Sequence, residues 1–91
     1  MKVMLVGGVK DAKFEKFSGA IKKNCGVEEV VTANLFKVKP EEVVAEEKPD
    51  VVVMLNKQKF DFGDIPVIDG MGLVYPQMGE KKVYEEISKL K

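Results

Sequence analysis

The sequence contains no histidine, and Cys25 is its only cysteine. Without histidine the chain has no imidazole metal ligand, no phosphohistidine and no access to the commonest general base. A single cysteine excludes an intrachain disulfide, which fits a reducing compartment, so we expect a cytoplasmic protein. The 15 basic and 15 acidic residues cancel, so no net field favours nucleic acid or an anionic membrane as a partner.

Long apolar runs are also missing. The first such run, MKVMLVGGV, is too short for a signal sequence or a bilayer span, so we expect no membrane insertion. The length of 91 residues fits one domain, 1–91, whose core needs no disulfide or metal. Asp61, Asp64 and Asp69 show no ligand pattern and are interpreted as loop-solvating residues. We predict neither a metal nor a cofactor.

Apolar runs alternate with helical patterns along the chain. Compact apolar or β-branched runs predict strands over residues 2–6, 28–34, 50–55 and 67–70. Between them, a stripe at three- and four-residue steps predicts a helix from Asp11, its N-cap, to just before Gly26; the stripe is Phe14, Phe17, Ile21 and Cys25. This alternation predicts an α/β fold with a parallel sheet and helices on both faces.

Two further helices complete the predicted pattern. Pro40 begins a short helix, and Pro49 ends it. The closing helix follows residue 79 and places Val83, Ile87 and Leu90 on one face. The stretch 70–79, with three glycines and a proline, is predicted to be a loop.

Two glycine-bearing stretches, 7–13 and 70–79, follow predicted strands. Ligands of such sheets bind beyond the carboxyl ends of the strands, so we expect the two stretches to face one another there. In the first stretch, the N–H groups of Gly7 and Gly8 form an expected anion nest, with Lys10 and Lys13 adding positive charge. The alternative, a plain strand-to-helix turn, stays open because the stretch matches no nucleotide motif.

The segment FGDIPVIDGMGLV, residues 62–74, resembles the IIB components of the bacterial sugar phosphotransferase system, and the galactitol-type branch in particular. The rest of the chain agrees more loosely, in its length, its Gly-Gly after the first strand and its closing helix. The resemblance implies a three-layer α/β sandwich with a four-stranded parallel sheet in the order 2-1-3-4. It also implies a cysteine that accepts phosphate from a IIA histidine and passes it to a sugar bound by the membrane component IIC.

The sequence departs from that family at the deciding residue. Alignment of the glycines puts Val6 at the cysteine position, and valine cannot carry a phosphoryl group. The resemblance assigns the remaining phosphate-loop positions to the residues that follow, which are Gly7, Gly8, Val9, Lys10, Asp11 and Lys13. It also implies that Asp69, Gly70 and Met71 line a cleft.

Other acceptors are less well placed. Cys25 lies beyond a helix and is interpreted as a small core residue, and Asp11 as a helix cap rather than an acyl-phosphate acceptor. The large apolar residues Met71, Leu73, Tyr75 and Met78 predict either a docking surface or a lid over the sheet.

Three functions follow from these observations. The first is a IIB-like protein without its phosphocysteine that binds a partner, such as a IIA or IIC relative, or a small anion. The second is an active phosphocarrier with a displaced acceptor. The third is a small interaction domain that shares only the fold.

Overall fold

The computed structural model describes residues 1–55, 62–75, 77 and 79–90. Four parallel strands form one sheet in the order β2-β1-β3-β4. Their bounds are Lys2–Gly7 for β1, Glu29–Asn34 for β2, Val51–Met54 for β3 and Val67–Asp69 for β4. The predicted α/β class with a four-stranded parallel sheet in the order 2-1-3-4 is therefore confirmed.

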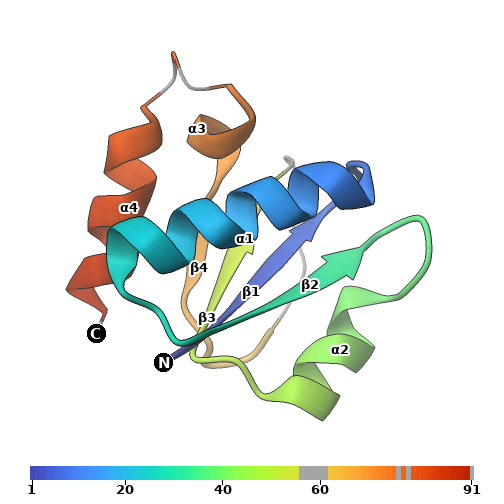
Figure 1. Cartoon of the computed structure of the whole chain (residues 1–91). Coiled ribbons are helices and arrows are strands. Elements are labelled where there is room, and N and C mark those ends of the chain that lie inside the picture. Colours follow the sequence, from blue (N-terminus) through green and yellow to red (C-terminus); the bar gives the residue numbers. More distant parts are fainter. Residues whose placement is uncertain (56–61, 76, 78, 91) are drawn as a thin grey trace.

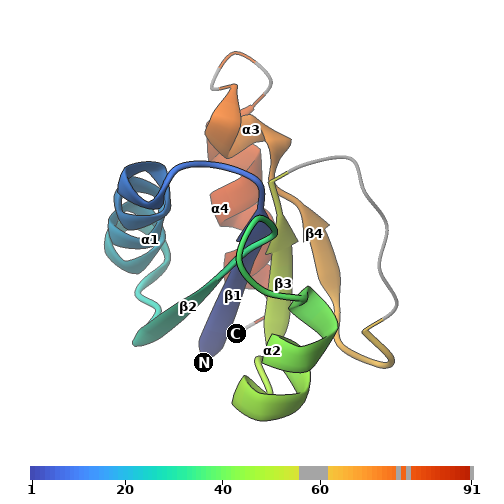
Figure 2. The same ribbon diagram turned by 90° about the vertical axis from the view of Figure 1, so that its right-hand side faces the viewer.

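Helices cover both faces of the sheet, which gives three layers (Figures 1 and 2). Helices α1 (Asp11–Cys25) and α4 (Glu80–Lys89) lie on one face, and α2 (Pro40–Glu47) lies on the other. Because β1 and β3 are central, they are apolar on both sides, as the sequence predicted. Among the described helices, none combines the length and the apolarity that crossing a bilayer would require.

Alternate residues of β1 feed two separate apolar clusters. Val3 and Leu5 join the larger cluster under α1 and α4, which includes the predicted stripe of α1. Met4 and Val6 point the other way, into a smaller cluster that Val43 and Val44 of α2 partly cover. The predicted inward stripe of α1 is confirmed, and Gly26 ends that helix with a left-handed backbone, as expected.

Two sequence predictions are wrong in detail. The stretch 70–79 is not all loop, because residues Met71–Val74 form the short helix α3, whose first N–H donates to Asp69 Oδ1 at 3.0 Å. A helix of four residues is too short to show a hydrophobic period. Leu90 does not join the buried face of α4, because that helix ends at Lys89 and leaves Leu90 46% exposed.

Candidate functional site

The turn between β1 and α1 lies at the carboxyl edge of the sheet. Gly7 is the last residue of β1 and is buried, whereas Gly8 is exposed. Neither glycine has a positive φ; in the described chain such glycines are Gly26, Gly63 and Gly79. The left-handed residue that is common in anion nests is therefore missing at Gly7 and Gly8.

Close packing explains why both positions are glycine. A Cβ on Gly7 would lie 2.7 Å from Leu55 Cβ, closer than two carbon atoms can pack. A Cβ on Gly8 would lie 3.3 Å from the ring of Phe36, a tight contact with a side chain that can move. The first glycine lets β1 pass beside the end of β3, and the second gives room to an aromatic ring from the β2–α2 loop.

Val6, at the position of the family's acceptor, lies inside the sheet. Its side chain is 0% exposed and belongs to the cluster on the α2 side. The β1–α1 turn begins two residues later, at Gly8, and Val9 packs against the opposite cluster. The Val6 side chain is therefore separated from solvent, and it does not line the pocket described below.

Asp11 is not the N-cap of α1 as predicted, because Lys10 takes that position. Lys10 has an extended backbone, and its carbonyl accepts from the N–H groups of Lys13 and Phe14 at 2.9 and 3.2 Å. Asp11 is thus the first helical residue, where a carboxylate is favoured by the helix dipole. Its side chain points to the neighbouring loop instead of capping its own helix.

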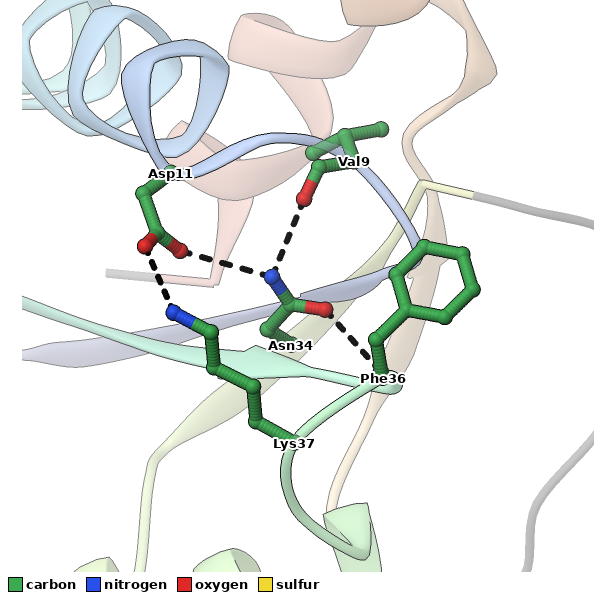
Figure 3. Close-up of polar contacts among 5 residues, drawn as sticks. All are labelled: Val9, Asp11, Asn34, Phe36 and Lys37. Atoms are coloured by element: carbon green, nitrogen blue, oxygen red, sulfur yellow. Dashed lines mark hydrogen bonds and ion pairs between the residues drawn. The ribbon is translucent and has the colours of Figure 1, made fainter.

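The carboxylate of Asp11 reaches Lys37 and Asn34 (Figure 3). Lys37 Nζ donates to Asp11 Oδ2 at 2.7 Å, and Asn34 Nδ2 lies 3.3 Å from Asp11 Oδ1. The hydrogen bond from Lys37, followed by the one from Asn34, holds the pKa of Asp11 below its usual value. Both charged side chains are exposed, so this pair positions the loops more than it stabilises the fold.

Asn34, the last residue of β2, joins the two loops through its amide (Figure 3). Its Nδ2 also donates to the carbonyl of Val9 at 3.1 Å, and its Oδ1 accepts from the backbone N–H of Phe36 at 3.0 Å. One side chain thus holds the β1–α1 turn and the β2–α2 loop at a fixed separation. Phe36 and Lys37 are thereby placed beside the residues that follow β1.

A pocket of about 680 Å³ lies between these two loops. Five of its eight described lining residues are charged or carry an amide, but most of the surface that they present to the pocket is apolar. The lining residues are Gly8, Val9, Lys10, Asp11, Lys13, Asn34, Phe36 and Lys37. The structure thus brings together five of the seven predicted phosphate-loop residues and excludes Val6 and Gly7. None of these lining residues carries a thiol, an imidazole or a hydroxyl group, and the one carboxylate among them, on Asp11, is held by Lys37 and Asn34.

Asn34, Phe36 and Lys37 were not predicted as site residues from the sequence. The signal that would have found them is the strand order, because β2 pairs in parallel with β1 from Lys2–Glu29 to Gly7–Asn34. Residues after β2 must then emerge beside residues after β1. From the sequence we expected the first turn to face the stretch after β4 instead. In the sheet, β3 lies between β1 and β4.

The predicted cleft residues lie at the same sheet edge but border a different pocket. Asp69 and Met71 line a smaller, more polar pocket of about 310 Å³ between α3 and α4. Gly70 is buried against the end of β3, where a Cβ would lie 2.4 Å from Val53 Cγ1. The two glycine-bearing stretches therefore flank β3, and the pockets described here share no lining residue.

The apolar residues after Gly70 have different surroundings. Leu73 is buried in the larger cluster, Met71 is half-buried and Tyr75 is exposed. This part of the predicted lid or docking surface is thus divided between core and solvent. Met78, and Asp61 among the aspartates considered as metal ligands, lie outside the described residues.

Cys25 lies at the far end of α1, 15 residues long, which places it about 20 Å from the β1–α1 turn. Its side chain is buried, and its Sγ donates to the carbonyl of Tyr84 at 3.5 Å. The prediction that Cys25 is a core residue is confirmed. Its thiol does not reach the pocket.

Comparisons of the chain with protein-family models, with curated proteins and with solved structures gave no match.

Proposed function

We propose that this chain is a IIB-like protein of the sugar phosphotransferase type, similar to the galactitol branch, that binds a ligand and does not carry phosphate. The ligand binds in the pocket between the β1–α1 and β2–α2 loops, named here the 8–37 pocket after its first and last residues. The support for the family is the FGDIP segment together with a sheet order equal to the one the resemblance implies. A shared sheet order alone is common among unrelated proteins.

One observation carries the functional part of the proposal. The position of the family's acceptor is a valine that is 0% exposed, while the pocket beside it is lined by glycine, aliphatic, aromatic, amide and charged residues. Phosphocarriers need a nucleophile that an incoming phosphoryl group can approach in line. The described residues supply binding groups at this place, and the one carboxylate among them, on Asp11, is already engaged by Lys37 and Asn34.

A phosphorylation assay tests this proposal. The chain is incubated with labelled phosphoenolpyruvate, the general phosphotransferase proteins and a galactitol-type IIA, with a functional IIB as the positive control. We expect label on the control and none on this chain. A stable label on this chain would refute the proposal and support a displaced acceptor, which mass spectrometry would then locate.

A further inference from the structure

We infer that the 8–37 pocket takes a small molecule in which a planar aromatic ring is joined to a phosphate-like dianion. The ring lies against Phe36, and the anionic group lies near Lys10 and Lys13. This inference rests on the proposed function and deepens it, because it names the chemical class of the ligand. It is drawn from the shape of the pocket, an exposed ring and the local balance of charge.

The pocket has the size and composition of a small-molecule site. Ligand pockets typically enclose about 300–1,000 Å³, with a mostly apolar lining and a few convergent polar groups. The 8–37 pocket has a volume of about 680 Å³, and most of the surface that it presents to a ligand is apolar. Its walls are two loops that Asn34 holds together, so the pocket exists before any ligand arrives.

Phe36 supplies a flat apolar surface that the fold itself does not use. Its side chain is 82% exposed, the largest value among the exposed apolar residues of the described chain. One part of the ring approaches Gly8, and the backbone N–H of Phe36 is fixed by Asn34 Oδ1. An exposed ring on a fixed backbone can stack with a second ring at the pocket, which favours an aromatic ligand over a purely aliphatic one.

The charges of the lining favour a dianion. Three lysines and one aspartate line the pocket. Asp11 and Lys37 neutralise one another across 2.7 Å. In the described part of the chain neither Lys10 nor Lys13 forms an ion pair, and both are exposed. Two positive charges therefore remain, and a phosphate monoester carries a charge of about −1.5 to −2 at neutral pH.

The surroundings of the pocket favour a small anion over a polyanion. The loop that carries Phe36 runs directly into α2, whose first turn contains Glu41 and Glu42, both exposed. A nucleic acid or an anionic membrane would extend its negative charges toward these carboxylates. A single phosphate in the pocket would not need to approach them, because neither glutamate lines it.

The test is a titration of the ¹⁵N-labelled full chain, followed by the backbone amide signals. The probes are AMP and phenyl phosphate, which combine ring and dianion, and adenosine and inorganic phosphate, which carry one part each. We expect saturable shifts at Gly8, Lys10 and Phe36 with both combined probes. Each single-part probe should bind about tenfold or more weakly, because it loses either the stacking or the charge contribution.

Variants assign the two parts of the ligand to their residues. Phe36→Ala should reduce AMP affinity to about that of inorganic phosphate, and its exposed position makes a loss of folding unexpected. Lys10→Gln with Lys13→Gln should reduce AMP affinity to about that of adenosine. Tyr75→Ala is the matched control, since Tyr75 is also an exposed aromatic residue but does not line the pocket.

The outcomes separate this inference from the proposed function. Equal affinity for AMP and inorganic phosphate would refute the aromatic part. No shift with any of the four probes would refute the ligand class, and tighter binding of an oligonucleotide or of anionic vesicles than of AMP would refute a small ligand. None of these results bears on the phosphorylation assay, which alone decides whether the chain carries phosphate.

Discussion

Glycines lie at the carboxyl ends of both β1 and β4, and the glycines of these two regions differ in what they contact. At the end of β1, Gly7 is buried against Leu55, but Gly8, the residue that follows the strand, is exposed at the 8–37 pocket. After β4, Gly70 and Gly72 are both buried, and Met71 between them begins α3. At this edge of the sheet the buried glycines lie where the backbone packs closely, while the exposed glycine lies at the opening of a pocket.

The largest effect is expected at Gly70. An alanine Cβ there would lie 2.4 Å from Val53 Cγ1 and 2.8 Å from the backbone carbonyl of Met54, which cannot move without disturbing β3. We expect Gly70→Ala to lower the free energy of unfolding by about 3 kcal/mol, measured by urea denaturation. A loss below about 1 kcal/mol would show that the residues around Gly70 can make room for a methyl group.

A smaller loss is expected at Gly7, with Gly8 as its matched control. Gly7→Ala should cost about 1–3 kcal/mol, because the new Cβ would lie 2.7 Å from Leu55 Cβ. Gly8→Ala meets only the ring of Phe36, which can shift, so unfolding should change little while the amide signal of Phe36 moves. Equal losses at both positions would contradict the division between packing glycine and site glycine.

A substitution at Gly19 is expected to raise the free energy of unfolding instead of lowering it. Gly19 lies in α1, is exposed, and a Cβ there would meet nothing within 4 Å. Gly19→Ala should therefore raise the free energy of unfolding by about 0.5–1 kcal/mol, since alanine favours helix and restricts the unfolded chain. A destabilised Gly19→Ala variant would mean that losses at Gly7 and Gly70 cannot be assigned to steric contact alone.

The smallest effect on stability is expected from the ion pair between the two loops. Because the folded-state pKa of Asp11 lies below the usual value of an aspartate, the contribution of its carboxylate to stability is present above that usual value and is lost as the pH falls through the folded-state pKa. The carboxyl carbon of Asp11, followed by NMR, should titrate with its midpoint at a lower pH than the carboxyl carbon of an aspartate in an unfolded peptide. Lys37→Gln should raise that midpoint, and an unchanged midpoint would show that the pair does not form in solution.

The elements that were predicted best are those in which apolar residues recur at a regular spacing or form a continuous run. The stripe of α1 and the continuous apolar runs of β1 and β3 predicted the correct elements, and the FGDIP resemblance implied the correct sheet order. Helix α3 was missed because four residues show no period, and Asp11 was misplaced by one position because an aspartate serves equally in a cap or a first turn.

Five of the eight residues that line the candidate site were predicted from the sequence. Residues 8–11 and Lys13 follow β1 directly, so their place at the sheet edge can be read from the chain order. Asn34, Phe36 and Lys37 depend on the lateral pairing of β2 with β1, which local sequence does not encode. The steric demands at Gly7 and Gly70 were also hidden, because they come from residues that are distant in the sequence. Leu55 lies 48 positions after Gly7, and Val53 lies 17 positions before Gly70.

The amide of Asn34 has a consequence for the chemical ageing of this molecule. Its nitrogen donates hydrogen bonds to Val9 and Asp11, while its oxygen accepts one from Phe36. No other side chain of equal length combines these donors with this acceptor. Deamidation would leave the oxygen in place but replace the donor with a second negative charge facing Asp11. The two loops would then repel each other, and one hydrolysed bond at the end of a strand would deform the cavity without disturbing the core.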